Sequence, residues 1–94
     1  MNKKIRGFNL KLLGIGFGNF VSLNRIVGVF HIDSSPIKRI IHVSKEKNLL
    51  IDATCGRKTQ SVLLMDSDHV VLSALSSEVI SEKINSLNSE QSCK

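Results

Sequence analysis

The most constraining stretch of the chain is residues 35–58, which reads SPIKRIIHVSKEKNLLIDATCGRK. Pro36 suits the first position of a helix after a serine cap, because the N–H that proline lacks needs no partner there. Isoleucines at helical spacing give this helix an apolar face, and the apolar residues 49–54 follow as a strand. Gly56 then marks a turn that carries an arginine and a lysine. One stretch therefore predicts a core helix, a core strand and a basic turn.

The other strands follow from apolar runs and turn residues. Strands are predicted over residues 10–15, 20–32, 49–54, 61–65 and 69–75. The second run is interrupted by Asn24 and Arg25, where we expect a bend or bulge that turns both side chains outward. Asp66 and Asp68 flank a tight turn between the last two runs, which predicts a hairpin.

A second helix is predicted to begin after a serine cap at Ser76 or Ser77. Its apolar face comprises Val79, Ile80, Ile84 and Leu87. We therefore expect one α+β domain over residues 10–87, with a small mixed β-sheet of about five strands, one central amphipathic helix and a C-terminal helix. A flexible basic extension is expected over residues 1–9, and a flexible polar tail over residues 88–94.

Composition narrows the class of protein. The 94 residues suffice for one small domain with an aliphatic core, whose modest size leaves room for stabilisation by self-association. Only two cysteines are present, too few for a disulfide framework, and no apolar run approaches the length of a membrane span. We expect a cytoplasmic protein without a membrane partner.

Positive charge is concentrated in the first part of the chain. Residues 1–58 carry a formal charge of +8 and residues 59–94 carry −3, giving the net +5. A surface divided in this way favours a polyanionic partner on its basic side. The acidic part is expected to face a neighbouring subunit or water.

Several candidate sites for other chemistry are weak. Residues 14–19, GIGFGN, lack the glycine spacing of a dinucleotide-binding motif and are better interpreted as a bent strand end. Asp66 and Asp68 supply only two carboxylates, which turn chemistry also selects. The three histidines lack the spacing of a zinc site, and Cys55 has no adjacent histidine base in the sequence. We therefore expect no enzyme activity, no cofactor or metal, and no small-molecule substrate.

The cationic side chains are a stronger candidate. They come from three segments, each at or near the end of an element: Arg25, Lys38 with Arg39, and Arg57 with Lys58. The turn at Gly56 combines two cations, a hydroxyl and accessible backbone N–H groups, which suit phosphate oxygens. A solvated basic face is the alternative, and convergence of the three segments on one face would favour binding over that alternative.

Five segments of the chain, in this order and spacing, are similar to segments of a known family. They are IGFGN (residues 15–19), NRIVGV (24–29), SPIKRII (35–41), LIDATCGRKT (50–59) and MDSDHVVLSAL (65–75). On these motifs, residues 10–80 resemble the RemA family of small bacterial proteins that regulate extracellular-matrix genes.

The resemblance implies a sequence-tolerant, DNA-binding regulator of transcription whose protomers close into a ring, with double-stranded DNA following the rim through backbone contacts. The residues to which it gives a DNA-binding role are Asn24, Arg25, Arg57 and Lys58. It also implies a functionally sensitive loop position at Pro36, with Gly56 shaping the basic turn. Lys38 and Arg39 are candidates for extending the basic track. The rival hypothesis is a structural or protein-interaction oligomer whose basic face binds an acidic partner protein.

Overall fold

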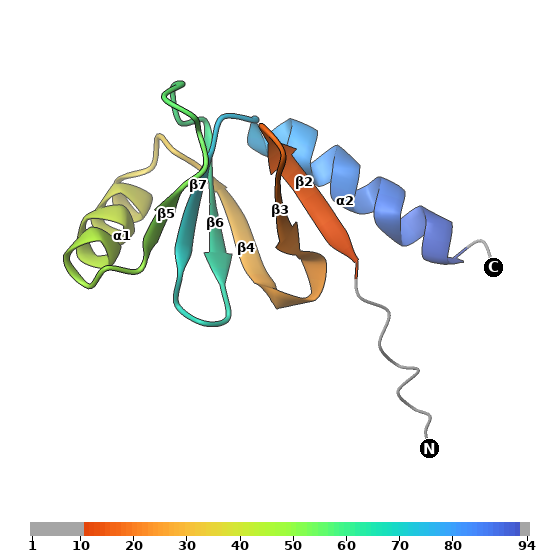
Figure 1. Ribbon diagram of the computed structural model, residues 1–94, viewed down its shortest axis with the longest axis horizontal. Coiled ribbons are helices and arrows are strands. Elements are labelled where there is room, and N and C mark those ends of the chain that lie inside the picture. Colours follow the sequence, from red (N-terminus) through yellow and green to blue (C-terminus); the bar gives the residue numbers. More distant parts are fainter. Residues whose placement is uncertain (1–10, 93–94) are drawn as a thin grey trace, which may run out of the picture.

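The computed structural model describes residues 11–92 and has the α+β fold that the sequence predicts (Figure 1). Its strands are β2 (Leu12–Gly16), β3 (Asn19–Ser22), β4 (Ile26–His31), β5 (Leu50–Asp52), β6 (Ser61–Met65) and β7 (Val70–Ser73). Its helices are the 3-10 helix η1 (Leu23–Arg25) and the α-helices α1 (Ser35–Glu46) and α2 (Ser77–Ser92). The extension predicted over residues 1–9 lies outside this range. Within the described range, neither α-helix is long and apolar enough to cross a lipid bilayer.

The described strands form two sheets, which differs from the single sheet of about five strands expected from the sequence. The expected strand over residues 20–32 is divided by η1, which lies where the sequence predicts a bend. Because η1 turns the chain, β3 pairs with β2 in a two-stranded hairpin while β4 joins a four-stranded sheet. The glycine-rich segment forms the tip of the β2–β3 hairpin, where Gly16, Phe17 and Gly18 all have positive φ.

The four-stranded sheet has the order β4-β6-β7-β5. Strand β6 is antiparallel to both of its neighbours, β4 and β7, and β5 runs parallel to β7 at the edge of the sheet. The predicted hairpin of the last two strands is confirmed, and Asp68 takes φ 72° in its turn. Along β6 the side chains alternate between the faces of the sheet, so that Leu63 and Val62 enter different cores.

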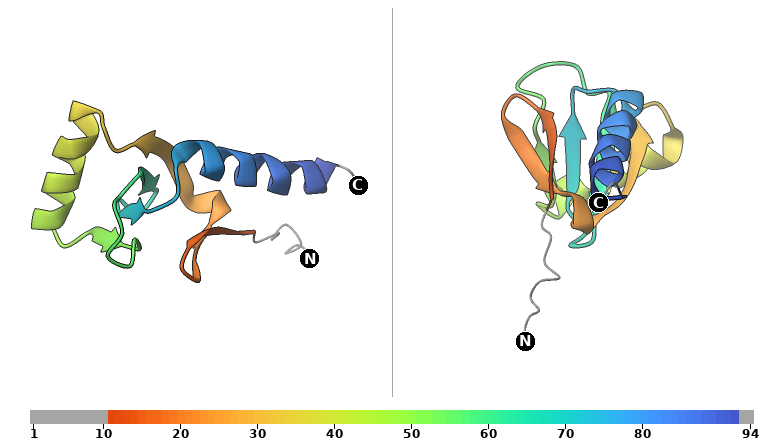
Figure 2. Two further views of the ribbon diagram at one scale, coloured as in Figure 1. Left: turned by 90° about the horizontal axis from the view of Figure 1, so that it is seen from above. Right: turned by 90° about the vertical axis from the view of Figure 1, so that its right-hand side faces the viewer.

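Each face of the sheet carries its own core. The β2–β3 hairpin and α2 cover one face, whose buried residues are Leu13, Ile15, Ala53, Leu63, Val71 and Ile80. Helix α1 packs on the other face, whose buried residues are Ile37, Val62, Val70 and Leu72. Figures 1 and 2 show α1 at the opposite end of the molecule from the hairpin and α2. The buried Ser73 joins the hairpin to the sheet, since its Oγ donates a hydrogen bond to the Ile15 carbonyl at 2.9 Å.

Helix α1 begins and ends as its sequence predicts. The Ser34 Oγ accepts a hydrogen bond from the Ile37 N–H at 3.3 Å, and Pro36 lies in the first turn. Asn48 takes the left-handed conformation, with φ 61°, just after the helix. The predicted apolar face is confirmed, because Ile37 is buried and both Ile40 and Ile41 pack against the same core.

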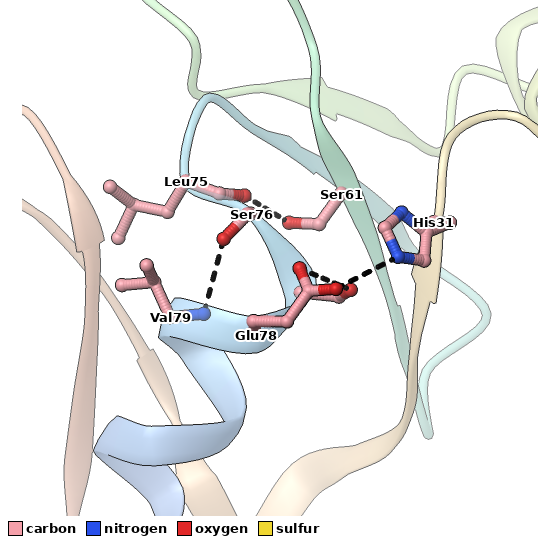
Figure 3. Close-up of polar contacts among 7 residues, drawn as sticks. His31, Ser61, Leu75, Ser76, Glu78 and Val79 are labelled. Carbon is pink, nitrogen blue, oxygen red and sulfur yellow. Dashed lines mark hydrogen bonds and ion pairs between the residues drawn. The ribbon is translucent and has the colours of Figure 1, made fainter.

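Helix α2 also begins at a predicted cap, with Ser76 Oγ accepting a hydrogen bond from the Val79 N–H at 3.2 Å (Figure 3). Ile80 is fully buried, and Ile84 and Leu87 pack against the core, as expected. Val79 was expected on the same face, but its side chain is 40% exposed. The helix continues past Leu87 as far as Ser92, so residues 88–92, which the sequence assigns to a tail, are helical.

Candidate nucleic-acid interface

The loop between β5 and β6 has a backbone fixed by local hydrogen bonds. Asp52 accepts hydrogen bonds from the N–H of Thr54 at 2.9 Å and from its hydroxyl at 2.6 Å. Cys55 and Gly56 then both have positive φ, 57° and 81°, which reverses the chain. The Arg57 N–H donates to the Thr54 carbonyl at 3.0 Å and closes the turn. The sequence predicts a glycine turn here, and the structure places it at one end of the four-stranded sheet.

Arg57 and Lys58 are both exposed at this turn, and we call this pair the basic corner. The Arg57 guanidinium lies over the ring of Phe17, 5.7 Å from its centroid. A cation over an aromatic face at an exposed site contributes about 0.5–1 kcal/mol. The contact joins the basic corner to the tip of the β2–β3 hairpin. Sequence reasoning misses this partner, because nothing in a glycine-rich turn indicates which loop its aromatic residue will contact.

The stability of the turn that carries the basic corner depends on pH through Asp52. The pKa of Asp52 lies below its ordinary value of 3.8, chiefly because the Thr54 hydroxyl donates to the carboxylate and secondly because the Thr54 N–H does. A lowered pKa means that the ionised carboxylate is favoured in the folded state. Its contribution to stability is therefore present above pH 3.8 and is lost as the pH falls through the folded-state pKa, which lies below that value.

Asp52→Asn is expected to lower the free energy of unfolding at neutral pH, because the amide oxygen is a weaker acceptor than the carboxylate. The difference from the unaltered chain should disappear as the pH falls below 3.8. Urea unfolding measured across this pH range tests the prediction, with Asp33→Asn as an exposed acidic control. A difference that is the same at every pH would contradict it.

A second basic site lies at η1, which contains Asn24 and Arg25, both exposed. The Arg25 Nη1 is 3.5 Å from Asp66 Oδ1, and the two side chains are 65% and 47% exposed. An ion pair this exposed is worth roughly 0–1 kcal/mol, so a phosphate can displace the carboxylate at little cost. The Asp66 N–H also donates to the Arg25 carbonyl at 2.9 Å, which ties η1 to the β6–β7 turn. The expected outward bend is therefore present, as a helical turn with an acidic neighbour.

The two basic sites lie at opposite ends of β6. Arg25 precedes Ile26, which pairs with Met65 at the end of this strand, whereas Lys58 lies just before Ser61 at its start. A five-residue strand spans roughly 17 Å, so these sites do not form one cluster in a protomer. The convergence considered from the sequence is therefore not found within a single chain. Both sites flank the β2–β3 hairpin, one beside its tip and the other at the end of β3.

Lys38 and Arg39 are exposed on α1, on the other face of the sheet from the hairpin. They neighbour Pro36 in the first turns of that helix. They add positive charge to that face of the protomer, whereas Arg57 contacts the hairpin on the opposite face.

The acidic and histidine side chains form scattered pairs. His31 Nε2 lies 3.4 Å from Glu78 Oε2 at the start of α2 (Figure 3), and His42 pairs with Glu46 at 3.2 Å within α1. The pKa of Glu78 is lowered because its carboxylate accepts a hydrogen bond from its own backbone N–H and lies beside His31. His69 contacts the Ser67 hydroxyl at 2.7 Å. Over residues 11–92, no three His, Cys, Asp or Glu side chains are grouped so that they could hold a metal ion.

Fold and site together define a small α+β protein with cationic turns at both ends of one sheet. The chain belongs to the RemA-like family, described as extracellular matrix regulatory protein A-like, whose family model matches residues 12–84. This confirms the resemblance seen in the sequence and makes the chain a member of a family of regulatory proteins.

Individual relatives agree with this assignment. A relative from Halalkalibacterium halodurans is 51% identical over 78 residues, which cover 83% of this chain and 90% of the relative. One from Carboxydothermus hydrogenoformans is 48% identical over 82 residues, covering 87% and 94% of the two chains. One from Oceanobacillus iheyensis is 53% identical over 76 residues, covering 81% and 88%. All three are named as regulatory proteins and not as enzymes.

Proposed function

We propose that this chain is a cytoplasmic, non-enzymatic regulator of transcription that binds double-stranded DNA with little sequence preference, and that it acts as a ring-like homo-oligomer. The observation that carries the proposal is the basic corner. Arg57 and Lys58 are exposed on a turn whose backbone is fixed by Asp52 and Gly56. Cations held in this way suit the phosphate backbone, which carries no sequence information by itself. The family description supports matrix genes as the class of target.

Self-association is part of the proposal because one chain offers few contacts to phosphates. A protomer presents two small basic sites at opposite ends of β6, each able to contact a few phosphates. Linking several protomers makes later contacts intramolecular and raises the overall affinity far above that of one chain. A duplex that follows such an assembly would be held mainly through its backbone and its ability to bend.

The rival function, a structural or protein-interaction oligomer, has one observation in its favour. Large apolar side chains are exposed on both sides of the protomer, including Phe20 at 61% and Val27 at 68%. Exposed apolar patches mark surfaces for protein contacts. The two functions differ in whether duplex DNA is retained by the assembled protein.

The salt dependence of DNA retention tests the proposal. Each phosphate that a cation neutralises releases counterions and contributes a slope of about −0.9 to the plot of log affinity against log salt. An assembly with about six or more phosphate contacts should lose roughly a thousandfold in affinity between about 50 and about 200 mM salt. Gel-shift titrations on duplexes of unrelated sequence should give similar slopes. A flat salt dependence, or assembly without retention of DNA at low salt, would favour the protein-interaction function.

A further inference from the structure

The β2–β3 hairpin presents an apolar surface to solvent. Its inner side packs on the core through Leu13, Ile15 and Val21. Leu12 and Phe20, by contrast, are 54% and 61% exposed. At the hairpin tip Phe17 is 50% exposed although Arg57 lies over its ring. We call Leu12, Phe17 and Phe20 the hairpin surface.

A groove lies on the other face of the four-stranded sheet, beside α1. Helix α1 packs over β5 and β7 and leaves the β4 side of this face partly open. The groove has a volume of about 610 Å³, and its apolar lining includes Val27, Ile40, Val43, Leu64 and Val70. Val27 is 68% exposed and Val43 is 40% exposed, so this lining is accessible to a partner. We call it the α1 groove.

Charged residues border both surfaces. Asp66 and Asp68 lie at the end of the α1 groove formed by the β6–β7 turn, and Arg39 and Lys47 lie along its helical wall. At the hairpin surface, Arg57 covers Phe17. The carboxylates at one surface are therefore complementary to the arginine at the other.

We infer that the hairpin surface of one protomer packs into the α1 groove of the next, and that this contact completes the DNA site. The inference rests on the proposed function for the role of DNA. Because the two surfaces lie on opposite faces of the sheet, a contact between them is head-to-tail and repeats from copy to copy. A second copy is the occupant that the chain itself supplies, since it carries both the apolar side chains and the complementary charge.

The contact would bring together, from two neighbouring protomers, the two basic sites that lie apart within one chain. Arg57 accompanies the hairpin tip, whereas Asp66, at the end of the groove, is paired with Arg25. Seating the hairpin of one protomer in the groove of its neighbour brings the basic corner of the first toward Arg25 of the second. The partner copy thus contributes residues that one protomer cannot place together.

Two substitutions at exposed positions test the two surfaces one at a time. Val27→Asp puts a carboxylate in the α1 groove, and Phe20→Asp puts one on the hairpin surface. In a solution of one variant, every chain has the same altered surface, so no intact hairpin surface finds an intact groove to pack into. Each variant alone should therefore sediment at the mass of a single 10.4 kDa chain. An equimolar mixture should form dimers and stop there, because only the hairpin of the Val27→Asp chain and the groove of the Phe20→Asp chain can meet. Val79→Asp is the matched control on α2 and should assemble like the unaltered chain.

Analytical ultracentrifugation of the separate and mixed variants gives a clear outcome, with circular dichroism melting to verify that each is folded. Unchanged assembly of either folded variant, or a mixture of folded variants that remains monomeric, would overturn the contact. DNA retention by the unaltered chain is measured separately. Retention together with unchanged assembly of Val27→Asp would refute the contact and leave the proposed function standing. Assembly that depends on both surfaces, without any DNA retention, would support the contact and refute the proposed function.

Discussion

Replacing both cations of the basic corner, Arg57→Ala with Lys58→Ala, is expected to lower the affinity for duplex DNA by at least about a hundredfold. Hydrogen bonds to charged groups contribute about 1.5–3 kcal/mol each, and roughly 1.4 kcal/mol corresponds to a factor of ten. The loss should be similar on duplexes of different sequence, because phosphate contacts fix position without reading bases. The salt slope should become shallower at the same time. Gel-shift titrations at several salt concentrations, on duplexes of different sequence, measure all three effects.

A matched control separates the basic corner from overall charge. Lys45→Ala with Lys83→Ala removes the same number of charges from exposed positions on α1 and α2 that belong to neither basic site. It is expected to reduce affinity much less than the corner variant. An equal reduction would mean that DNA responds to net charge and that Arg57 and Lys58 have no special part in binding.

Leu63→Ala is expected to cost about 2–5 kcal/mol of unfolding free energy, the usual range for removing a buried leucine side chain. Leu63 is fully buried at the centre of the core beneath the hairpin and α2. Small domains have a total stability of about 5–15 kcal/mol, so this one change should leave a large fraction of the chains unfolded on mild heating.

Urea unfolding at a fixed protomer concentration is the appropriate measurement, since assembly adds to apparent stability. Val79→Ala provides the comparison, because Val79 is 40% exposed on α2 and its truncation should cost less than about 1 kcal/mol. Equal losses for the two variants would show that the described core does not account for the stability of the fold.

Elements with local signals were predictable from the sequence. The cap at Ser34, the proline after it and the left-handed Asn48 bound α1 as expected, because each acts through its own backbone and nearest neighbours. The β6–β7 hairpin was equally clear, since its turn is short and its strands are adjacent in the chain.

The division of the sheet could not be predicted in the same way. Residues 20–32 have strand-forming composition on both sides of Asn24, and composition does not say that the two halves join different sheets. Their partners are distant in sequence, with β4 pairing to β6. Pairing at that distance depends on how the whole core packs, which a local pattern does not contain.

The candidate site was predictable in kind but not in arrangement. Charge and turn chemistry identified Arg25, Arg57 and Lys58, and all three are exposed, Arg25 at the end of η1 and the other two in the loop between β5 and β6. Their positions at opposite ends of β6 depend on the direction of that strand in the sheet. The ring of Phe17 and the carboxylate of Asp66 were not recognised as partners of the arginines, because both contacts join loops far apart in sequence.

The two left-handed residues before the basic corner have a consequence for the entropy of binding. An L-residue such as Cys55 pays roughly 1–2 kcal/mol to adopt this conformation, a cost that a glycine there would avoid. A glycine would also give the loop more freedom, and a freer loop must be immobilised when a ligand binds. The non-glycine residue makes this turn less stable but also less free to move, so that, in the proposed complex with DNA, Arg57 would lose less conformational freedom on contacting a phosphate.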